Sequence, residues 1–169
     1  IAPAPQPDLP PEIALALAPS RPVAVRIARI EVNSELIETG LRQDGSLEVP
    51  PGDEGSPASW FRDSSSPGST GPAVILGHVN SLSDESGVFY RLSELAPGDT
   101  VAVSREDGSS ATFAVYASEV HPKDEFPTKA VYFPVRGSEL RLITCGGYSE
   151  ASNYYEDNLI VYAKLVATA

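Results

Sequence analysis

The sequence predicts a mainly β domain, built as a compact barrel or sandwich. Short segments of apolar or alternating residues recur along most of the chain, and Gly, Pro, Asn and Asp gather between them. We expect roughly seven or eight strands and only one or two short helices, because helical spacing is rare in this chain.

The composition limits what the domain can bind. The chain has 169 residues and a net charge of −11, from 12 Lys and Arg against 23 Asp and Glu. Such an acidic surface repels phosphates, so neither nucleic acid nor an anionic membrane surface is an expected partner. No apolar run approaches the roughly 20 residues needed to span a bilayer. One cysteine excludes an internal disulfide, and two histidines make a zinc site unexpected.

The first 22 residues contain seven prolines, which disfavour regular structure. We expect residues 1–22 to be a spacer before a single domain over 23–169. The alternative is an arm packed on that domain. Because the chain begins at Ile1 and lacks methionine, we expect a signal peptide or membrane anchor upstream of it.

The strands predicted in the first half of the chain differ in pattern. Over 23–32 apolar residues alternate with Arg and Glu, which indicates a half-buried strand containing a bulge. A second short strand begins at 36–37, and a third covers 47–49. Residues 73–78 are apolar up to the final His78, a pattern typical of a strand buried on both faces.

Three segments of the chain are predicted to lie outside the strands. Residues 51–70 are rich in Gly, Ser and Pro, and we expect a long surface connection held down by Trp60 and Phe61. Residues 88–95 have apolar positions at helical spacing, which predicts a short amphipathic helix. Residues 121–138 are expected to form a second long loop in which His121 faces solvent.

The second half contains the clearest hairpin, formed by predicted strands at 100–104 and 111–120. The next predicted strand, 140–145, ends at the only cysteine, and we expect the glycine pair that follows to stop it. A polar loop over 146–157 then leads to the last strand, 159–166.

Cys145 and His78 occur in the same setting. Each lies at the end of a strongly apolar strand and is followed by turn-forming residues. A thiolate at neutral pH needs a nearby cation or proton acceptor, most often an imidazole. The pattern therefore suggests a Cys–His catalytic site. The alternative is a cysteine that packs as a small hydrophobic residue and a histidine with a structural place.

The motifs around both residues resemble those of the sortase family. Leu142–Cys145 is similar to the family signature Thr-Leu-x-Thr-Cys, and Gly77–His78 after an apolar strand resembles its catalytic histidine motif. Further segments occur in the family's order: Leu47–Pro50, Gly71–Ala73, Val88–Leu92, Pro97–Asp99 and Lys123–Thr128. The resemblance covers about 23–167, and the segments 142–147 and 157–163 are most similar to the actinobacterial class F branch.

The resemblance implies an eight-stranded closed β-barrel and a cysteine transpeptidase that is anchored in the membrane and works at the cell surface. Cys145 would attack the Thr carbonyl of an LPxTG-like C-terminal sorting signal, cut between Thr and Gly, and form a thioacyl intermediate. His78 would act as general acid toward the leaving amine and as general base toward a cell-wall precursor amine. Neither cofactor nor metal is implied, and a monomer is expected.

Two other functions stay open at this point. The same site could use water as the acceptor, which would make the chain a hydrolytic cysteine peptidase. A weakly active or inactive sortase-like surface protein could instead bind sorting signals without turning them over.

The resemblance leaves the third catalytic residue open. The family carries an arginine after the cysteine to stabilise the oxyanion, but no arginine follows Arg141 here, and Glu156 stands where class F relatives often have one. Asn158 could donate hydrogen bonds in its place. An upstream arginine, Arg91 or Arg141, could reach the site, since strand alternation puts Arg141 on the same face as Cys145. The third alternative is reduced activity.

Five residues are expected to contact the substrate because they lie near the family motifs in the sequence: Thr144, Val79, Leu82, Tyr90 and Phe126. The acidic pairs Asp84–Glu85 and Asp124–Glu125 lack the alternating spacing of a calcium loop. We therefore interpret them as solvated loop residues.

Overall fold

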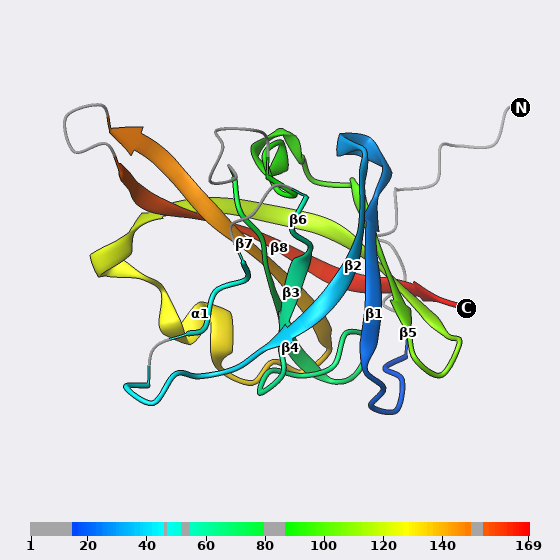
Figure 1. Cartoon of the computed structure of the whole chain (residues 1–169). Helices are drawn as coiled ribbons and strands as arrows, with labels where there is room; N and C mark the ends of the chain where they lie inside the picture. Colours follow the sequence, from blue (N-terminus) through cyan, green and yellow to red (C-terminus); the bar gives the residue numbers. More distant parts are fainter. Residues whose placement is uncertain (1–14, 46, 52–54, 80–86, 150–153) are drawn as a thin grey trace, which may run out of the picture.

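The computed structural model describes residues 15–45, 47–51, 55–79, 87–149 and 154–169. Their eight strands close into one barrel in the order β1–β2–β3–β4–β7–β8–β6–β5 (Figure 1). The predicted fold, a mainly β chain forming an eight-stranded closed barrel, is confirmed.

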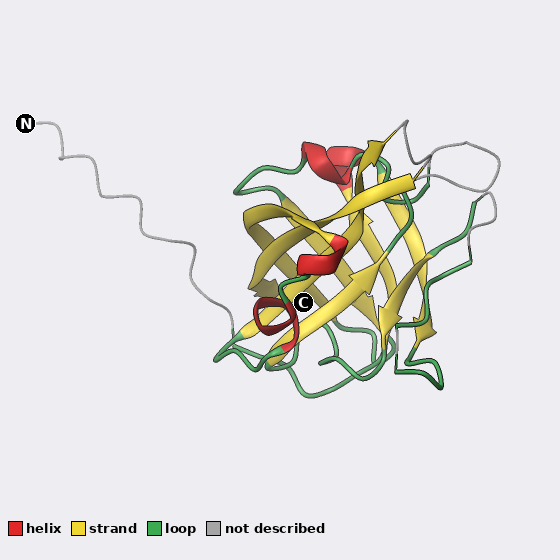
Figure 2. Cartoon of the chain, turned by 90° about the vertical axis from the view of Figure 1, so that its left-hand side faces the viewer, coloured by secondary structure: helices red, strands yellow, loops and turns green. Residues whose placement is uncertain are grey.

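The strands are β1 (Pro22–Ile27), β2 (Val32–Thr39), β3 (Ala58–Phe61), β4 (Gly71–Leu76), β5 (Thr100–Arg105), β6 (Ser110–Pro122), β7 (Ser138–Ser149) and β8 (Tyr154–Thr168). Four short helical segments connect them: the 3-10 turns η1 (Ala28–Ile30), η2 (Leu92–Glu94) and η3 (Lys123–Glu125), and helix α1 (Thr128–Tyr132). Figure 2 shows these helical segments outside the strands of the barrel. Among the described residues, no helix is both long enough and apolar enough to cross a bilayer.

Two apolar clusters hold the barrel together. The first fills its interior with fully buried side chains, including Val25, Ile27, Phe89, Leu92, Val101, Phe113, Leu140, Leu142 and Leu165. The second covers the outer face of β4, β7 and β8, where Val131 of α1 packs with Val74, Leu76, Ile143, Ile160 and Tyr162. Because β4 is buried on both faces, its sequence is continuously apolar rather than alternating.

The predicted strand over 23–32 ends earlier than expected, since β1 stops at Ile27 and Val32 is already the first residue of β2. The 3-10 turn η1 separates β1 from β2, and Glu31 adopts a left-handed backbone with φ 58°. The two strands then pair antiparallel, with Ala24 opposite Glu35. Ile30 and Val32 are buried across this turn, so the apolar spacing that suggested one strand is satisfied by a tight hairpin.

The predicted loop over 51–70 contains a strand of the barrel. Ala58–Phe61 form β3, which lies parallel to β2 and antiparallel to β4, and all four residues are buried. Trp60 also donates its Nε1–H to the carbonyl of Ser65 at 3.2 Å. The surrounding Gly, Ser and Pro residues hide so short a strand from sequence patterns.

The strands β6, β7 and β8 are longer than predicted. The glycine pair does not end β7, because Gly146 still pairs with Asp157 and the strand continues to Ser149. Most of the predicted polar loop over 146–157 is therefore a long hairpin of β7 and β8 that projects from the barrel (Figure 1), while 150–153 lie outside the described residues.

The two remaining segments also differ from prediction. The predicted helix over 88–95 is a series of turns ending in η2, although Phe89, Leu92 and Leu95 are buried. The predicted loop over 121–138 contains the end of β6, then η3 and α1.

The described part of the N-terminal spacer lies on the barrel. Leu17 donates its backbone N–H to the carbonyl of Gly68 at 2.7 Å, and the guanidinium of buried Arg105 donates to the carbonyl of Ala18. Arg21 pairs with Glu106 at 2.9 Å. Residues 17–21 thus contact the domain, whereas Leu15 is 90% exposed, and 1–14 lie outside the described residues.

The short link between β4 and His78 yields a stability prediction. A β-carbon at Gly77 would come within 2.4 Å of the ring of Phe89, which is fully buried and cannot move away cheaply. Gly77→Ala should therefore lower the free energy of unfolding by about 1–3 kcal/mol, as measured by urea denaturation.

Gly137→Ala is the matched control, because a β-carbon there would meet nothing within 4 Å. It should leave the free energy of unfolding unchanged or raise it by about 0.4–1 kcal/mol. Equal midpoints for the two variants would show that the contact with Phe89 does not constrain Gly77.

Candidate active site

The parallel pairing of β4 with β7 determines where His78 and Cys145 lie relative to each other. The register joins Gly71 to Ser138 and Leu76 to Ile143, a constant offset of 67 residues. Gly77 continues it, donating its N–H to the carbonyl of Ile143 at 3.1 Å. The paired residues end at Leu76, and the same offset carried two residues farther would set His78 beside Cys145 at a strand spacing of about 4.8 Å.

Asn158 lies on the other side of Cys145. The antiparallel pairing of β7 with β8 places the two residues directly opposite each other, as it does Ile143 and Ile160. Ile160 belongs to the outer apolar cluster, so Asn158, two residues before it on β8, occupies an outer position of the same sheet. The register therefore places Cys145 opposite Asn158, and His78 follows the strand that pairs with β7.

A backbone carbonyl orients the ring of His78. Its Nε2 lies 2.7 Å from the carbonyl oxygen of Pro50, which can only accept a hydrogen bond. Nε2 therefore donates, and in the neutral ring Nδ1 is left as the proton acceptor. The carbonyl of His78 in turn accepts the N–H of Phe89 at 3.0 Å. Sequence reasoning missed the Pro50 carbonyl, since a main-chain acceptor leaves no mark in residue type.

An apolar groove of about 860 Å³ leads to this site. It extends from Gly71 and Pro72 at the start of β4 to Asn158. Most of its walls are apolar side chains: Leu41, Leu47, Val49, Phe61, Leu76, Phe126, Tyr132, Pro134, Val135 and Ile143. Asp63 and Lys123 also line it. Such a groove suits an extended peptide with apolar side chains.

The other residues expected at the substrate take different places. Phe126 lines the groove, whereas Tyr90 and Val79 are not among its lining residues. Thr144 is 4% exposed, and its Oγ1 has no hydrogen-bond partner in the described part of the chain. It occupies an inward position of β7, on the opposite face from Ile143. Leu82 lies outside the described residues.

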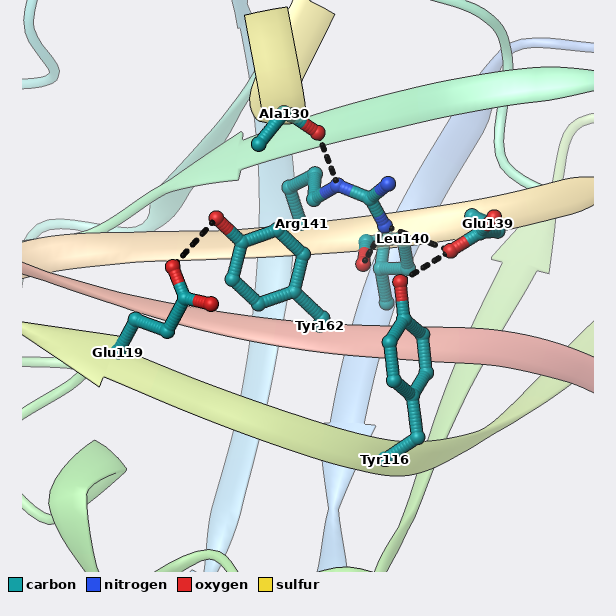
Figure 3. A network of polar contacts seen from close by, with 7 residues as sticks. All are labelled: Tyr116, Glu119, Ala130, Glu139, Leu140, Arg141 and Tyr162. Atoms are coloured by element: carbon teal, nitrogen blue, oxygen red, sulfur yellow. Dashed lines mark hydrogen bonds and ion pairs between the residues drawn. The ribbon is translucent and has the colours of Figure 1, made fainter. Parts of the chain in front are cut away.

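Arg141 is held away from Cys145 by a network of its own (Figure 3). The residue is 2% exposed, and its Nη1 pairs with Glu139 at 3.0 Å. Its Nε donates to the carbonyl of Ala130 in α1 at 3.2 Å, and its guanidinium lies 4.7 Å from the ring centroid of Tyr162. Arg141 lies four residues before Cys145, about 13 Å along the strand.

The network around Arg141 joins the wall of the groove to the strand that carries Cys145. Tyr116 donates its hydroxyl to Glu139, and burial together with this hydrogen bond raises the pKa of Tyr116. Because Arg141 bonds to the main chain of α1, and Thr128 and Tyr132 of α1 line the groove, the guanidinium fixes that wall to β7. Arg91 is also engaged elsewhere, pairing with Glu94 at 2.7 Å and Glu31 at 3.2 Å.

Within the described residues, no group of three or more His, Cys, Asp or Glu side chains could hold a metal ion.

Solved structures of several sortases share this architecture. Sortase A from Corynebacterium diphtheriae is similar with a TM-score of 0.65 at 20% identity, over 92% of this chain and 62% of that one. Sortase C from Actinomyces oris gives a TM-score of 0.66 at 22% identity, over 86% and 73% of the two chains. A sortase D transpeptidase from Clostridium perfringens gives 0.64 at 20% identity, over 87% and 79%. Because these identities are low, the similarity to the solved structures establishes a shared fold and nothing more.

The family itself follows from the sequence match. No curated protein matches the chain. The model of the sortase domain, however, matches residues 25–166, which include β1 to β8 almost entirely. The chain therefore belongs to the sortase family.

Proposed function

We propose that the chain is the catalytic domain of a sortase-type cysteine transpeptidase of the class F branch. It acts at the cell surface on an LPxTG-like sorting signal, and the full-length protein is held there by a membrane anchor. The observation that carries the proposal is the offset of 67 residues between β4 and β7, which relates His78 to Cys145. The apolar groove beside them supports a peptide substrate.

In the proposed reaction, Cys145 attacks the carbonyl of the signal's Thr residue. The Thr–Gly bond breaks, His78 gives a proton to the leaving amine, and a thioacyl enzyme remains. An amine of a cell-wall precursor then attacks the thioester and releases Cys145. The bond from His78 Nε2 to Pro50 supports Nδ1 as the nitrogen that exchanges protons with these groups.

Asn158 is the residue we propose for the place of the family arginine. It is the cross-strand partner of Cys145 and lines the groove, whereas the guanidinium of Arg141 is bonded to Glu139 and α1. Its side-chain amide would donate a hydrogen bond to the oxyanion. A neutral donor stabilises that charge less than a guanidinium does, which predicts a slow enzyme.

The first test removes the two proposed reacting groups. Cys145→Ala should abolish cleavage of an LPxTG peptide and the thioacyl adduct seen by mass spectrometry. His78→Ala should lower kcat/KM by about 10²–10⁴, because it removes the general acid and base. Normal cleavage by the Cys145→Ala protein would refute the assignment. Product formed with and without an added amine distinguishes a transpeptidase from a hydrolytic peptidase.

The second test concerns Asn158. Asn158→Asp keeps the shape of the side chain but removes its N–H donors, and should lower kcat/KM by about 10²–10³. Arg141→Lys serves as comparison: by weakening the contact with α1 it should raise KM while changing kcat less. If instead Asn158→Asp is fully active and Arg141→Lys loses kcat, the donor is Arg141.

A further inference from the structure

The groove is longer than the sorting signal that it is proposed to hold. It extends from Pro72, at the start of β4, to Asn158, the cross-strand partner of Cys145. Pro72 pairs with Glu139, and Cys145 lies farther along β7 by about 20 Å, at roughly 3.3 Å per residue. In an extended Leu-Pro-x-Thr segment the Leu lies only about 10 Å from the Thr, so roughly half of the groove is left over.

The proposed reaction determines which part of the substrate lies in the groove. The acyl part of the signal stays on the enzyme through both half-reactions, whereas the glycine side leaves and an amine takes its place. Because a preformed groove holds the part that stays, the Thr lies at the Asn158 end, and the chain N-terminal to the signal points toward the start of β4. About three residues N-terminal to the Leu fill the remaining length.

The end of the groove at the start of β4 is polar, in contrast with its apolar middle. The residues that line it there are Asp63, Ser64, Ser65 and Thr70. Hydrogen bonds fix this turn to β4: Ser65 donates its N–H to the carbonyl of Pro72 at 3.2 Å, and Ser64 Oγ accepts the N–H of Val74 at 3.0 Å. A peptide that follows β4 away from Asn158 therefore passes the apolar walls first and then reaches Asp63.

The carboxylate of Asp63 is available to a ligand. The residue is exposed, and within the described part of the chain no hydrogen bond or ion pair engages its side chain. The guanidinium of the adjacent Arg62 lies against Gly40, which does not line the groove. Lys123, the other charged residue of the lining, follows the end of β6 beside Asp157, at the opposite end. The polar end of the groove thus offers a negative charge to an incoming peptide.

We propose that Asp63 selects substrates with a basic side chain about three residues before the Leu of the sorting signal, an inference that rests on the proposed transpeptidase function. An arginine or lysine at that position pairs with the carboxylate. The pair lies about 20 Å from the level of Cys145, so it stabilises the bound substrate and the transition state equally. Asp63 therefore affects KM and leaves kcat unchanged.

The test varies the charge on both partners. Two LPxTG peptides carry either Arg or Glu at the third position before the Leu and are otherwise identical. At physiological salt, which screens distant charges, the ratio of kcat/KM for the Arg peptide to that for the Glu peptide should be about five in the wild-type protein. The ratio should be about one in Asp63→Asn and should reverse in Asp63→Lys, with each change in KM.

Glu35→Lys is the matched control, because it makes the same change of charge at an exposed carboxylate of β2 outside the groove, and should keep the wild-type ratio. An unchanged ratio in Asp63→Lys would overturn the inference alone, and so would an equal loss of preference in Glu35→Lys, which would assign it to the overall charge. A wild-type protein that forms no thioacyl enzyme with either peptide would overturn the proposed function as well.

Discussion

The parallel ladder between β4 and β7 is the constraint on which the site depends. Parallel strands run in the same direction, so the residues just after the end of β4 lie beside the part of β7 that contains Cys145. This ladder is buried on both faces, with Ile75 and Leu142 in the barrel interior and Leu76 and Ile143 in the outer cluster. Shifting one of the two strands by one residue would exchange its interior and exterior side chains. Packing on both faces therefore fixes the register that relates His78 to Cys145.

The antiparallel pairings of β8 extend that order across the sheet. Through these pairings Asn158 lies opposite Cys145, and His121 lies opposite Asn158. Asn158 also lines the groove. A closed barrel suits this arrangement, because every strand is hydrogen-bonded on both edges. The backbone that carries these residues therefore has little freedom to shift.

Residue patterns predicted β4 and the middle of β7. The sequence of β4 is apolar without interruption, and Leu140, Leu142 and Ile143 indicate β7 on either side of Arg141. The closed barrel came from the family resemblance, since no local pattern specifies which distant strands pair. For the same reason β3 was missed and His121 was predicted to face solvent in a loop: its place beside Asn158 depends on the register of β6 with β8. The Pro50 carbonyl could not be predicted, because any residue supplies one.

Arg141 shows the limit of predicting contacts from the alternation of side chains along a strand. It does share a face with Cys145, as the period of a strand requires, but a buried guanidinium needs several acceptors, and Glu139 with the main chain of α1 supplies them nearby. Reaching the site would break the bonds of Arg141 to Glu139 and to the carbonyl of Ala130, and would leave the largely buried guanidinium without these acceptors. The charge is therefore used to hold the groove wall to β7. The residue that lies opposite Cys145 is Asn158, whose side chain is a neutral amide and can donate a hydrogen bond without carrying a charge.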